Sequence, residues 1–228
     1  MESGAMMDSY TDLFLRSLPL LIRGIGMTLQ VLILSASLSI SLGFIFGILS
    51  CRRLKMALVS PFVETVAFVL RAVPFYVQLM IVYFVLPDLL GFNFEPFPAA
   101  VLALGLCSSG YVAQIIRSGV NAIPDHQWEA AFSLGYGKIQ SLCSIILPQT
   151  VRQVLPNLNN ELDALLKSTA VVSSIGLLEL TRAGMNIVSR EMEPVPIYLM
   201  VALFYLCLSA VLNAGARTLE KRLKYVKS

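Results

Sequence analysis

Residues 24–50 read GIGMTLQVLILSASLSISLGFIFGILS and contain no charged side chain. A helix that crosses the roughly 30 Å hydrocarbon layer of a membrane needs about 20 consecutive, mostly apolar residues. This run is long enough, and it ends at Cys51-Arg52-Arg53-Leu54-Lys55, a basic cluster typical of the membrane surface. The stretch predicts a transmembrane helix and therefore a membrane protein.

The composition of the whole chain supports this prediction. Hydrophobic residues make up 57% of the 228 residues, charged residues make up 14%, and the mean hydropathy is +0.76. Soluble domains are only about 45–50% apolar. The net charge of +3 is modest and argues against nucleic-acid binding. The four cysteines are widely separated and form no CxxC pair, so we expect neither a metal site nor a disulfide.

Breaks between the apolar runs divide the chain into five predicted spans. Pro87-Asp88 closes the second run, and Asn121-Ala122-Ile123-Pro124 closes the third. Several charged residues lie within 171–194, which we expect to be a partly helical, partly interfacial segment outside the membrane. The predicted fold is an all-α membrane protein, a single transmembrane domain over residues 1–228. Its helices cover about 24–51, 58–86, 98–121, 145–170 and 195–217.

The basic residues of the short loops assign the sides of the membrane, because cytoplasmic loops collect Lys and Arg. Loop 52–55 carries three basic residues, whereas loop 87–97 carries Asp88 and Glu95 and no basic residue. The C-terminal tail carries five more basic residues from Arg217 onward. We therefore expect a multi-pass protein of the inner (cytoplasmic) membrane, with the N-terminus outside and the C-terminus in the cytoplasm.

A short amphipathic segment lies between the third and fourth spans. Pro124 and Asp125 are typical of a helix start, and Gly135 is typical of a stop. The predicted helix covers about 125–136. A helix lying in the lipid headgroups usually carries Lys and Arg on its polar face, whereas this one carries His126 and Glu129. We favour docking to another protein over a headgroup location. The docking residues would be Trp128, Glu129, Ala130, Ala131 and Gly135.

This segment resembles the EAA signature of the permease subunits of ATP-binding cassette importers. The matching residues are Glu129-Ala130-Ala131, Gly135, Ile145 and Leu147-Pro148. Residues 71–74 (RAVP), with Gln78-Leu79, resemble a segment of the polar amino-acid branch of that family. Further matches at 97–100, 111–117, 166–169 and 179–183 extend the resemblance over about residues 17–222.

The resemblance implies a five-helix core with a cytoplasmic coupling helix, the type I importer permease fold. It implies three protein partners: a dimer of ATPase subunits docked under the coupling helix, an extracytoplasmic amino-acid-binding protein, and a second permease subunit, which is either a copy of this chain or a related chain. The sequence has no Gly-x-x-x-x-Gly-Lys-Ser/Thr loop; its nearest fragment, Gly135-Tyr136-Gly137-Lys138, lacks the first glycine and the hydroxyl. We therefore expect no cofactor in this chain, no enzymatic activity of its own, and ATP and magnesium on the partner ATPase.

Polar residues inside the predicted spans are candidates for the solute pathway, because ionisable groups in a membrane need a partner or water. Arg71 lies three residues before Pro74, which interrupts helical hydrogen bonding. It is a candidate either for holding a carboxylate or for a structural ion pair, for example with Asp163. The resemblance adds Gln114, where family members that carry basic amino acids have a glutamate. The full candidate set is Arg71, Gln114, Lys167, Ser168 and Thr169.

Gln114 and Ser168 stand where cation-carrying relatives have acidic residues, as the resemblance implies. This departure favours a neutral polar amino acid such as glutamine. An interhelical hydrogen bond is an equally good interpretation of Gln114.

Other classes of function remain open from the sequence. An ion-coupled secondary transporter would use the same buried charges, but it predicts an internal repeat, and we find none. A membrane enzyme would need a clustered catalytic set, which one histidine and scattered cysteines do not provide. A membrane anchor for a cytoplasmic complex is a further alternative. A homodimer is the default assembly, because closed two-fold assemblies dominate. Membrane lipid would surround it.

Overall fold

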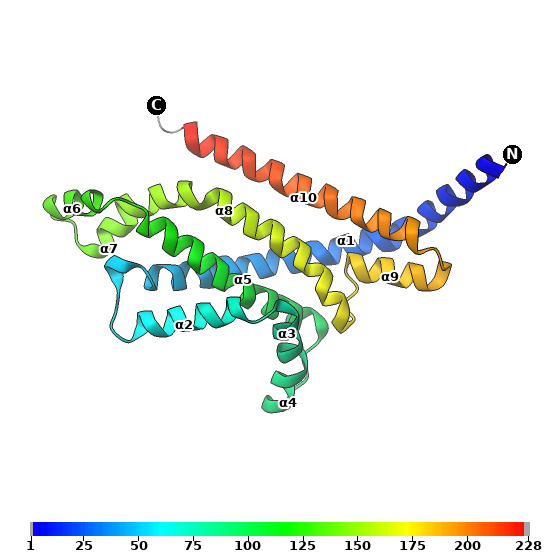
Figure 1. The fold of residues 1–228 in the computed structure, drawn as a ribbon, viewed down its shortest axis with the longest axis horizontal. Coiled ribbons are helices and arrows are strands. Elements are labelled where there is room, and N and C mark those ends of the chain that lie inside the picture. The colour runs from blue at the N-terminus through cyan, green and yellow to red at the C-terminus, as the bar shows by residue number, and fades with distance from the viewer. Residues whose placement is uncertain (1, 226–228) are drawn as a thin grey trace.

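The computed structural model describes the backbone of residues 2–225 and the side chains of residues 11–222. The described residues form helices and no strands (Figure 1). Three helices are long and apolar enough to cross a membrane, and the number rises to five when each of two bent helix pairs is counted as one span. The predicted all-α membrane fold is confirmed.

The first and third spans form the centre of the bundle. Helix α1 (Glu2–Leu49) packs along α5 (Pro96–Asn121), and their close approach depends on small residues. A Cβ atom on Gly43 would lie 2.5 Å from Val112 Cβ, and one on Gly47 would lie 2.7 Å from Ile116 Cβ. Glycine at these positions lets the two backbones touch, as in other membrane helix pairs.

The second predicted span, 58–86, is not one helix. Helix α2 (Val59–Ala72) ends two residues before Pro74. The chain then bends by 102° and continues as α3 (Phe75–Met80), the π-helical turn η2 (Ile81–Val85) and α4 (Leu86–Leu90). Proline lacks an amide and forces the residue before it into an extended conformation, and Val73 has φ −82° and ψ 129°. We call residues 75–90 the arm, which projects from the bundle in Figure 1.

The fourth span begins earlier and ends later than the predicted 145–170. After α6 (Asp125–Ser133), α7 (Lys138–Ser141) and the π-helical turn η3 (Leu142–Ile146) lead into α8 (Leu147–Ser168) and the 3-10 helix η4 (Thr169–Ile175). Gly176, with φ +84°, turns the chain by 48° into α9 (Leu180–Glu191). Residues 171–194 are therefore mostly helical, with breaks at 176–179 and 192–193.

The last helix, α10 (Pro194–Tyr225), runs back along the bundle beside α8. The first and last helices are both longer than the predicted 24–51 and 195–217, because α1 begins at Glu2 and α10 ends at Tyr225. Figure 1 shows α6, α7, the α1–α2 loop and the C-terminal end together at one end of the bundle, and the N-terminus and α9 at the other. We call these the α6 end and the α9 end.

Candidate functional site

Helix α6 is held against the bundle by its apolar face. Trp128 is 2% exposed and Ala131 is 1% exposed. They lie on the side of the helix that faces the chain's own core, and Trp128 belongs to a buried cluster with Cys51, Ile123 and Leu142. The large indole therefore fixes the helix to the end of α1 and to the turn before α8.

The opposite face of α6 is open. Glu129 and Ala130 of α6 are exposed, as are Leu134 and Gly135 directly after it, and Gly135 has φ +85°, a left-handed conformation that suits glycine. Of the predicted docking residues, Glu129, Ala130 and Gly135 are accessible to a partner.

Trp128 and Ala131 are not accessible, so the structure does not offer them for docking. The amphipathic pattern identified the right face, but that face anchors the helix.

Asp125, in the first turn of α6, is bound by two arginines of the α1–α2 loop. Arg53 Nη2 lies 2.7 Å from one carboxylate oxygen, and Arg52 Nη2 lies 3.1 Å from the other. The hydrogen bond from Arg53, with the positive charges of both arginines, lowers the pKa of Asp125 below its ordinary range. Sequence reasoning missed this contact, although the basic cluster and the acidic helix start were both visible.

Arg71 and Gln114 meet between α2 and α5. Arg71 Nη1 donates a hydrogen bond to Gln114 Oε1, and Arg71 Nε donates to the Ala67 carbonyl oxygen at 3.1 Å. The expected pairing of Arg71 with Asp163 is wrong. Asp163 instead faces α10, where Ser209 donates to it, and it pairs with Lys167 on its own helix at 2.6 Å.

Two cavities lie on either side of Arg71. One has a volume of about 420 Å³ and is lined by Glu64, Arg71, Gln114 and Arg117, among others. The second has a volume of about 410 Å³ and is lined by Arg71, the Pro74 break, Ser108, Glu161 and Ser168, among others. Ser108 donates to Glu161 at 2.7 Å, which joins α5 to α8 in the wall of the second cavity.

The five predicted pathway residues therefore do not form one cluster. Arg71, Gln114 and Ser168 line the cavities, whereas Lys167 is exposed and paired with Asp163. Thr169 is buried, donates to the Leu166 carbonyl oxygen at 2.6 Å, and lines neither cavity. Helix α8 ends at Ser168, two residues before the predicted end, so Thr169 belongs to the 3-10 helix η4.

The carbonyls opened by Pro74 are occupied. Gln78 Nε2 donates to the carbonyl oxygens of Leu70 and Val73, at 2.8 Å each. A membrane interior has no water to satisfy such groups, so a side chain must do so. These carbonyls are thus used to stabilise the break itself.

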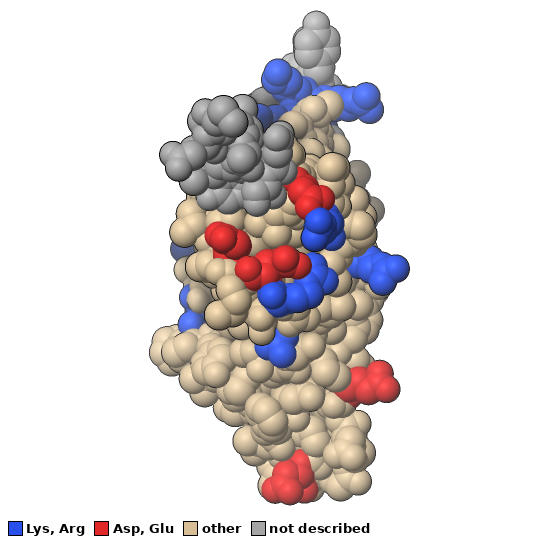
Figure 2. All heavy atoms as spheres, turned by 90° about the vertical axis from the view of Figure 1, so that its right-hand side faces the viewer, with Lys and Arg blue, Asp and Glu red and all other residues tan. Residues whose placement is uncertain are grey.

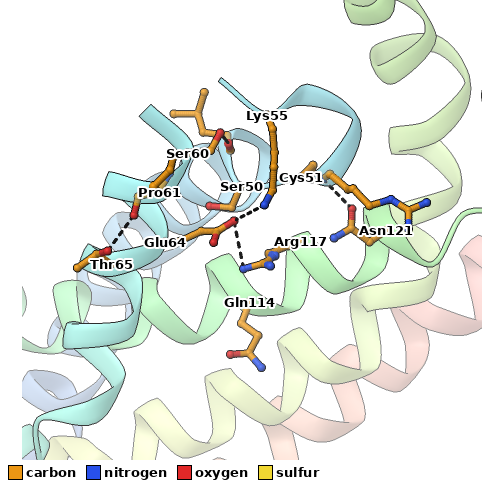
Figure 3. A network of polar contacts seen from close by, with 12 residues as sticks. Ser50, Cys51, Lys55, Ser60, Pro61, Glu64, Thr65, Gln114, Arg117 and Asn121 are labelled. Atoms are coloured by element: carbon orange, nitrogen blue, oxygen red, sulfur yellow. Dashed lines mark hydrogen bonds and ion pairs between the residues drawn. The ribbon is translucent and has the colours of Figure 1, made fainter. Parts of the chain in front are cut away.

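Glu64 lies between two basic residues near the first cavity. Its Oε1 is 3.7 Å from Lys55 Nζ and 3.5 Å from Arg117 Nη1. Figure 3 shows Glu64 of α2 reaching toward Lys55 of the α1–α2 loop and Arg117 of α5, while Gln114 points away from this trio. The network ties both spans and their loop together at the α6 end.

Glu179 is a second site that the sequence did not single out. It is fully buried and caps α9, accepting hydrogen bonds from the amides of Thr181 and Arg182 at 2.8 and 2.7 Å. Tyr205 of α10 donates to it at 2.9 Å. The carboxylate thus joins the start of α9 to α10. Among the described side chains, no cluster of three or more His, Cys, Asp or Glu residues could hold a metal ion.

The arrangement of these helices defines a class of protein. Residues 39–225 match the family described as "Binding-protein-dependent transport system inner membrane component", and the chain belongs to that family. It is the membrane-spanning permease component of a transport system, as the sequence predicted.

Particular relatives narrow the comparison. The chain is 36% identical over 212 residues to the arginine transport system permease protein ArtQ of Bacillus subtilis (strain 168), covering 91% of this chain and 94% of ArtQ. It is 34% identical over 211 residues to the glutamine transport system permease protein GlnP of Escherichia coli (strain K12), with the same two coverages.

Solved structures agree with the fold. A crystal structure of an amino acid ABC transporter with histidines matches with a TM-score of 0.83 and 31% identity, covering 92% of this chain and 96% of that one. The inward-facing methionine transporter MetNI matches with a TM-score of 0.80 at 18% identity, covering 90% of this chain and 97% of that one. The type I importer permease fold is thus confirmed.

Proposed function

We propose that this permease moves polar amino acids, with glutamine as the leading candidate, through alternating inward-open and outward-open states. The observation that carries this proposal is the pair of cavities around Arg71, which place polar side chains such as Gln114 and Glu161 inside helices that must otherwise be apolar. The similar proteins named for arginine and glutamine transport support the substrate class.

The lining residues support a neutral amino acid over a cationic one. The guanidinium of Arg71 suits a substrate carboxylate, because arginine presents a planar fork of donors and the contacts with Ala67 and Gln114 use only Nε and Nη1. Gln114 offers an amide rather than a negative charge, and Ser168 offers a hydroxyl. A cationic side chain would find only Glu64 and Glu161 as acidic partners in the two cavities, and both already have partners.

Energy is proposed to come from separate ATPase subunits. They would bind ATP and magnesium, dock as a dimer on Glu129, Ala130 and Gly135 of α6, and push this helix when they close. Trp128 and Ala131 would transmit that push, because they pack α6 onto the bundle. This chain then needs no enzymatic activity of its own.

The remaining partners follow from the orientation. Basic residues mark the α6 end as cytoplasmic, with the C-terminus inside and the N-terminus outside. The α9 end would then receive the extracytoplasmic amino-acid-binding protein; Figure 2 shows acidic and basic side chains gathered on this end. A second copy of the chain would complete the pathway as a homodimer.

The test is uptake into proteoliposomes that hold this chain, its co-purifying ATPase and its binding protein, with ATP inside. A panel of radiolabelled amino acids would include glutamine, arginine and histidine. We expect ATP-dependent uptake of glutamine, which Glu129→Ala abolishes or strongly reduces. Gln140→Ala, an exposed change on neighbouring α7, is the matched control. Uptake that follows an ion gradient and ignores ATP would instead establish the ion-coupled secondary transporter.

A further inference from the structure

The side-chain contacts at the α6 end form a connected path from α6 to α2. The inference drawn from this path rests on the proposed function, in which the ATPase docks on α6. The first part of the path is the binding of Asp125 by Arg52 and Arg53. Arg53 makes two contacts with the same carboxylate oxygen, from Nη2 at 2.7 Å and from Nε at 3.2 Å. Arg52 adds contacts to both oxygens, at 3.1 and 3.4 Å. A short loop thereby holds the start of α6 at several atoms.

The same loop is itself held firmly. Arg52 donates its backbone amide to Asn121 Oδ1 of α5 at 3.1 Å. Cys51 is buried beside Trp128 in one apolar cluster. On the far side of the loop, the hydroxyl of buried Ser60 donates to the Leu49 carbonyl oxygen at 2.6 Å and accepts from the Met56 amide at 2.9 Å. A loop tethered in this way passes on a displacement instead of absorbing it.

The second part of the path runs from the loop into the bundle. Lys55 pairs with Glu64 of α2, which also pairs with Arg117 of α5 (Figure 3). Glu64 and Arg71 are seven residues apart, about two helical turns, so they lie on the same face of α2. Both line the 420 Å³ cavity together with Gln114. The path therefore ends at a candidate solute site.

Direct backbone packing does not provide the same route. The close backbone neighbours of α6 belong mostly to α7 and η3, the segments that continue into α8. The connection of α6 to the first two spans is made by side chains, namely the indole of Trp128 and the carboxylate of Asp125. Trp128 reaches the end of α1, whereas Asp125 reaches the loop that leads into α2.

We propose that residues 51–55 form a coupling connector that links movement of α6 to movement of α2. Asp125, Arg52, Arg53, Lys55 and Glu64 are its positioning residues, and none of them needs to contact the ATPase or to react with anything. Exposed ion pairs contribute little to stability, so this set is better explained by directing motion than by holding the fold. Loss of the connector should leave ATP hydrolysis running while less solute moves per ATP.

The experiment measures glutamine uptake and ATP hydrolysis in the same proteoliposomes of the complete transporter. Asp125→Asn removes the negative charge with almost no change in shape, and the double variant Arg52→Gln/Arg53→Gln removes the two positive charges that bind it. We expect each to lower the uptake per ATP by about three- to tenfold, and the triple variant to lower it no further, because both changes break one linkage. Asp125→Glu, which restores a carboxylate, should recover most of the ratio.

Asp12→Asn is the matched control, since Asp12 forms an exposed ion pair with Arg16 near the other end of α1. It should leave the ratio unchanged. Gel filtration of each complex shows whether the subunits stay assembled. If Asp125→Asn lowers uptake and hydrolysis in proportion, or detaches the ATPase, Asp125 belongs to the docking surface and the connector is wrong. An unchanged ratio also overturns it. If the native complex shows no ATP-dependent uptake at all, the proposed function fails instead.

Discussion

The α1–α2 loop and the arm are the two places where the chain leaves the axis of the bundle, and they are held in opposite ways. The loop is fixed by ion pairs, hydrogen bonds and a buried cluster. The arm has one polar fixing point, Gln78 at its base, and exposes Phe84, Leu89 and Leu90 beyond it. Both follow an apolar helix, yet only the loop is bound by polar contacts to several elements at once.

The difference shows what holds a chain together in lipid. Exposed apolar side chains such as Leu89 gain little by packing on protein, because lipid tails are equally apolar. The arm can therefore extend from the bundle, provided that its own helical turns satisfy its backbone. At the membrane surface water competes for polar and charged groups, and the loop needs a specific set of partners to keep one position.

The largest expected effect comes from Trp128, which packs α6 against the α1–α2 loop. Trp128→Ala would leave a large cavity under α6 and lower the free energy of unfolding by about 3–5 kcal/mol. The expected result is loss of ATPase co-purification together with a lower midpoint of thermal unfolding. Leu134→Ala, on the same segment but 75% exposed, is the control for the thermal midpoint and should leave it unchanged. Equal effects of the two variants would contradict the inward placement of Trp128.

The arm can be tested with two leucines ten residues apart. Leu79, near its base, is fully buried, whereas Leu89, near its tip, is 75% exposed. Leu79→Ala should lower the free energy of unfolding by about 2–5 kcal/mol. Leu89→Ala should change it by no more than about 0.5 kcal/mol. Thermal unfolding of both variants in the same detergent measures the contrast, and a large loss in Leu89→Ala would mean that the tip is packed.

The base of the arm gives a smaller effect. Gln78→Leu would keep the size of the side chain but leave two carbonyls without a donor, at a cost of about 1–3 kcal/mol. The midpoint of thermal unfolding should fall accordingly. Gln153→Leu, on an exposed face of α8, is the matched control. An unchanged midpoint in Gln78→Leu would show that the break does not depend on this side chain.

The smallest effect concerns pH at the loop. The pKa of Asp125 is lowered in the folded chain by the hydrogen bond and charge of Arg53 and the charge of Arg52. Its contribution to stability is therefore fully present above its ordinary pKa and is lost as the pH falls through the lowered value. Thermal midpoints of the native chain and of Asp125→Asn should differ slightly at pH 7 and converge in strong acid. A difference that grows toward acid would contradict this sign.

The sequence predicted the all-α membrane fold, because long apolar runs and their proline and glycine breaks are local signals. It also placed the start of α6 at Asp125, where the structure has it. The bend at Pro74 was visible as an interruption, but its 102° angle was not, since that depends on Gln78 and on the helices around it.

The pairing of side chains between helices was the part that sequence could not supply. Arg71 pairs with Gln114 and not with Asp163, because α5 lies beside α2, whereas Asp163 faces α10. The orientation of Trp128 could not be predicted for a related reason: an amphipathic pattern identifies an apolar face without saying whether that face contacts a partner protein or the chain itself. The Asp125 contact joins residues more than seventy positions apart, and no local pattern marks it.

The buried position of Trp128 also has a spectroscopic consequence. It is the one tryptophan in the sequence, so the indole fluorescence of this polypeptide comes from a single known place. Emission should be blue-shifted while the ring is surrounded by apolar side chains and should shift to the red when water reaches it. Trp128 is therefore an intrinsic probe of how α6 packs on the bundle, and a shift in its emission wavelength would report release of this helix without any added dye.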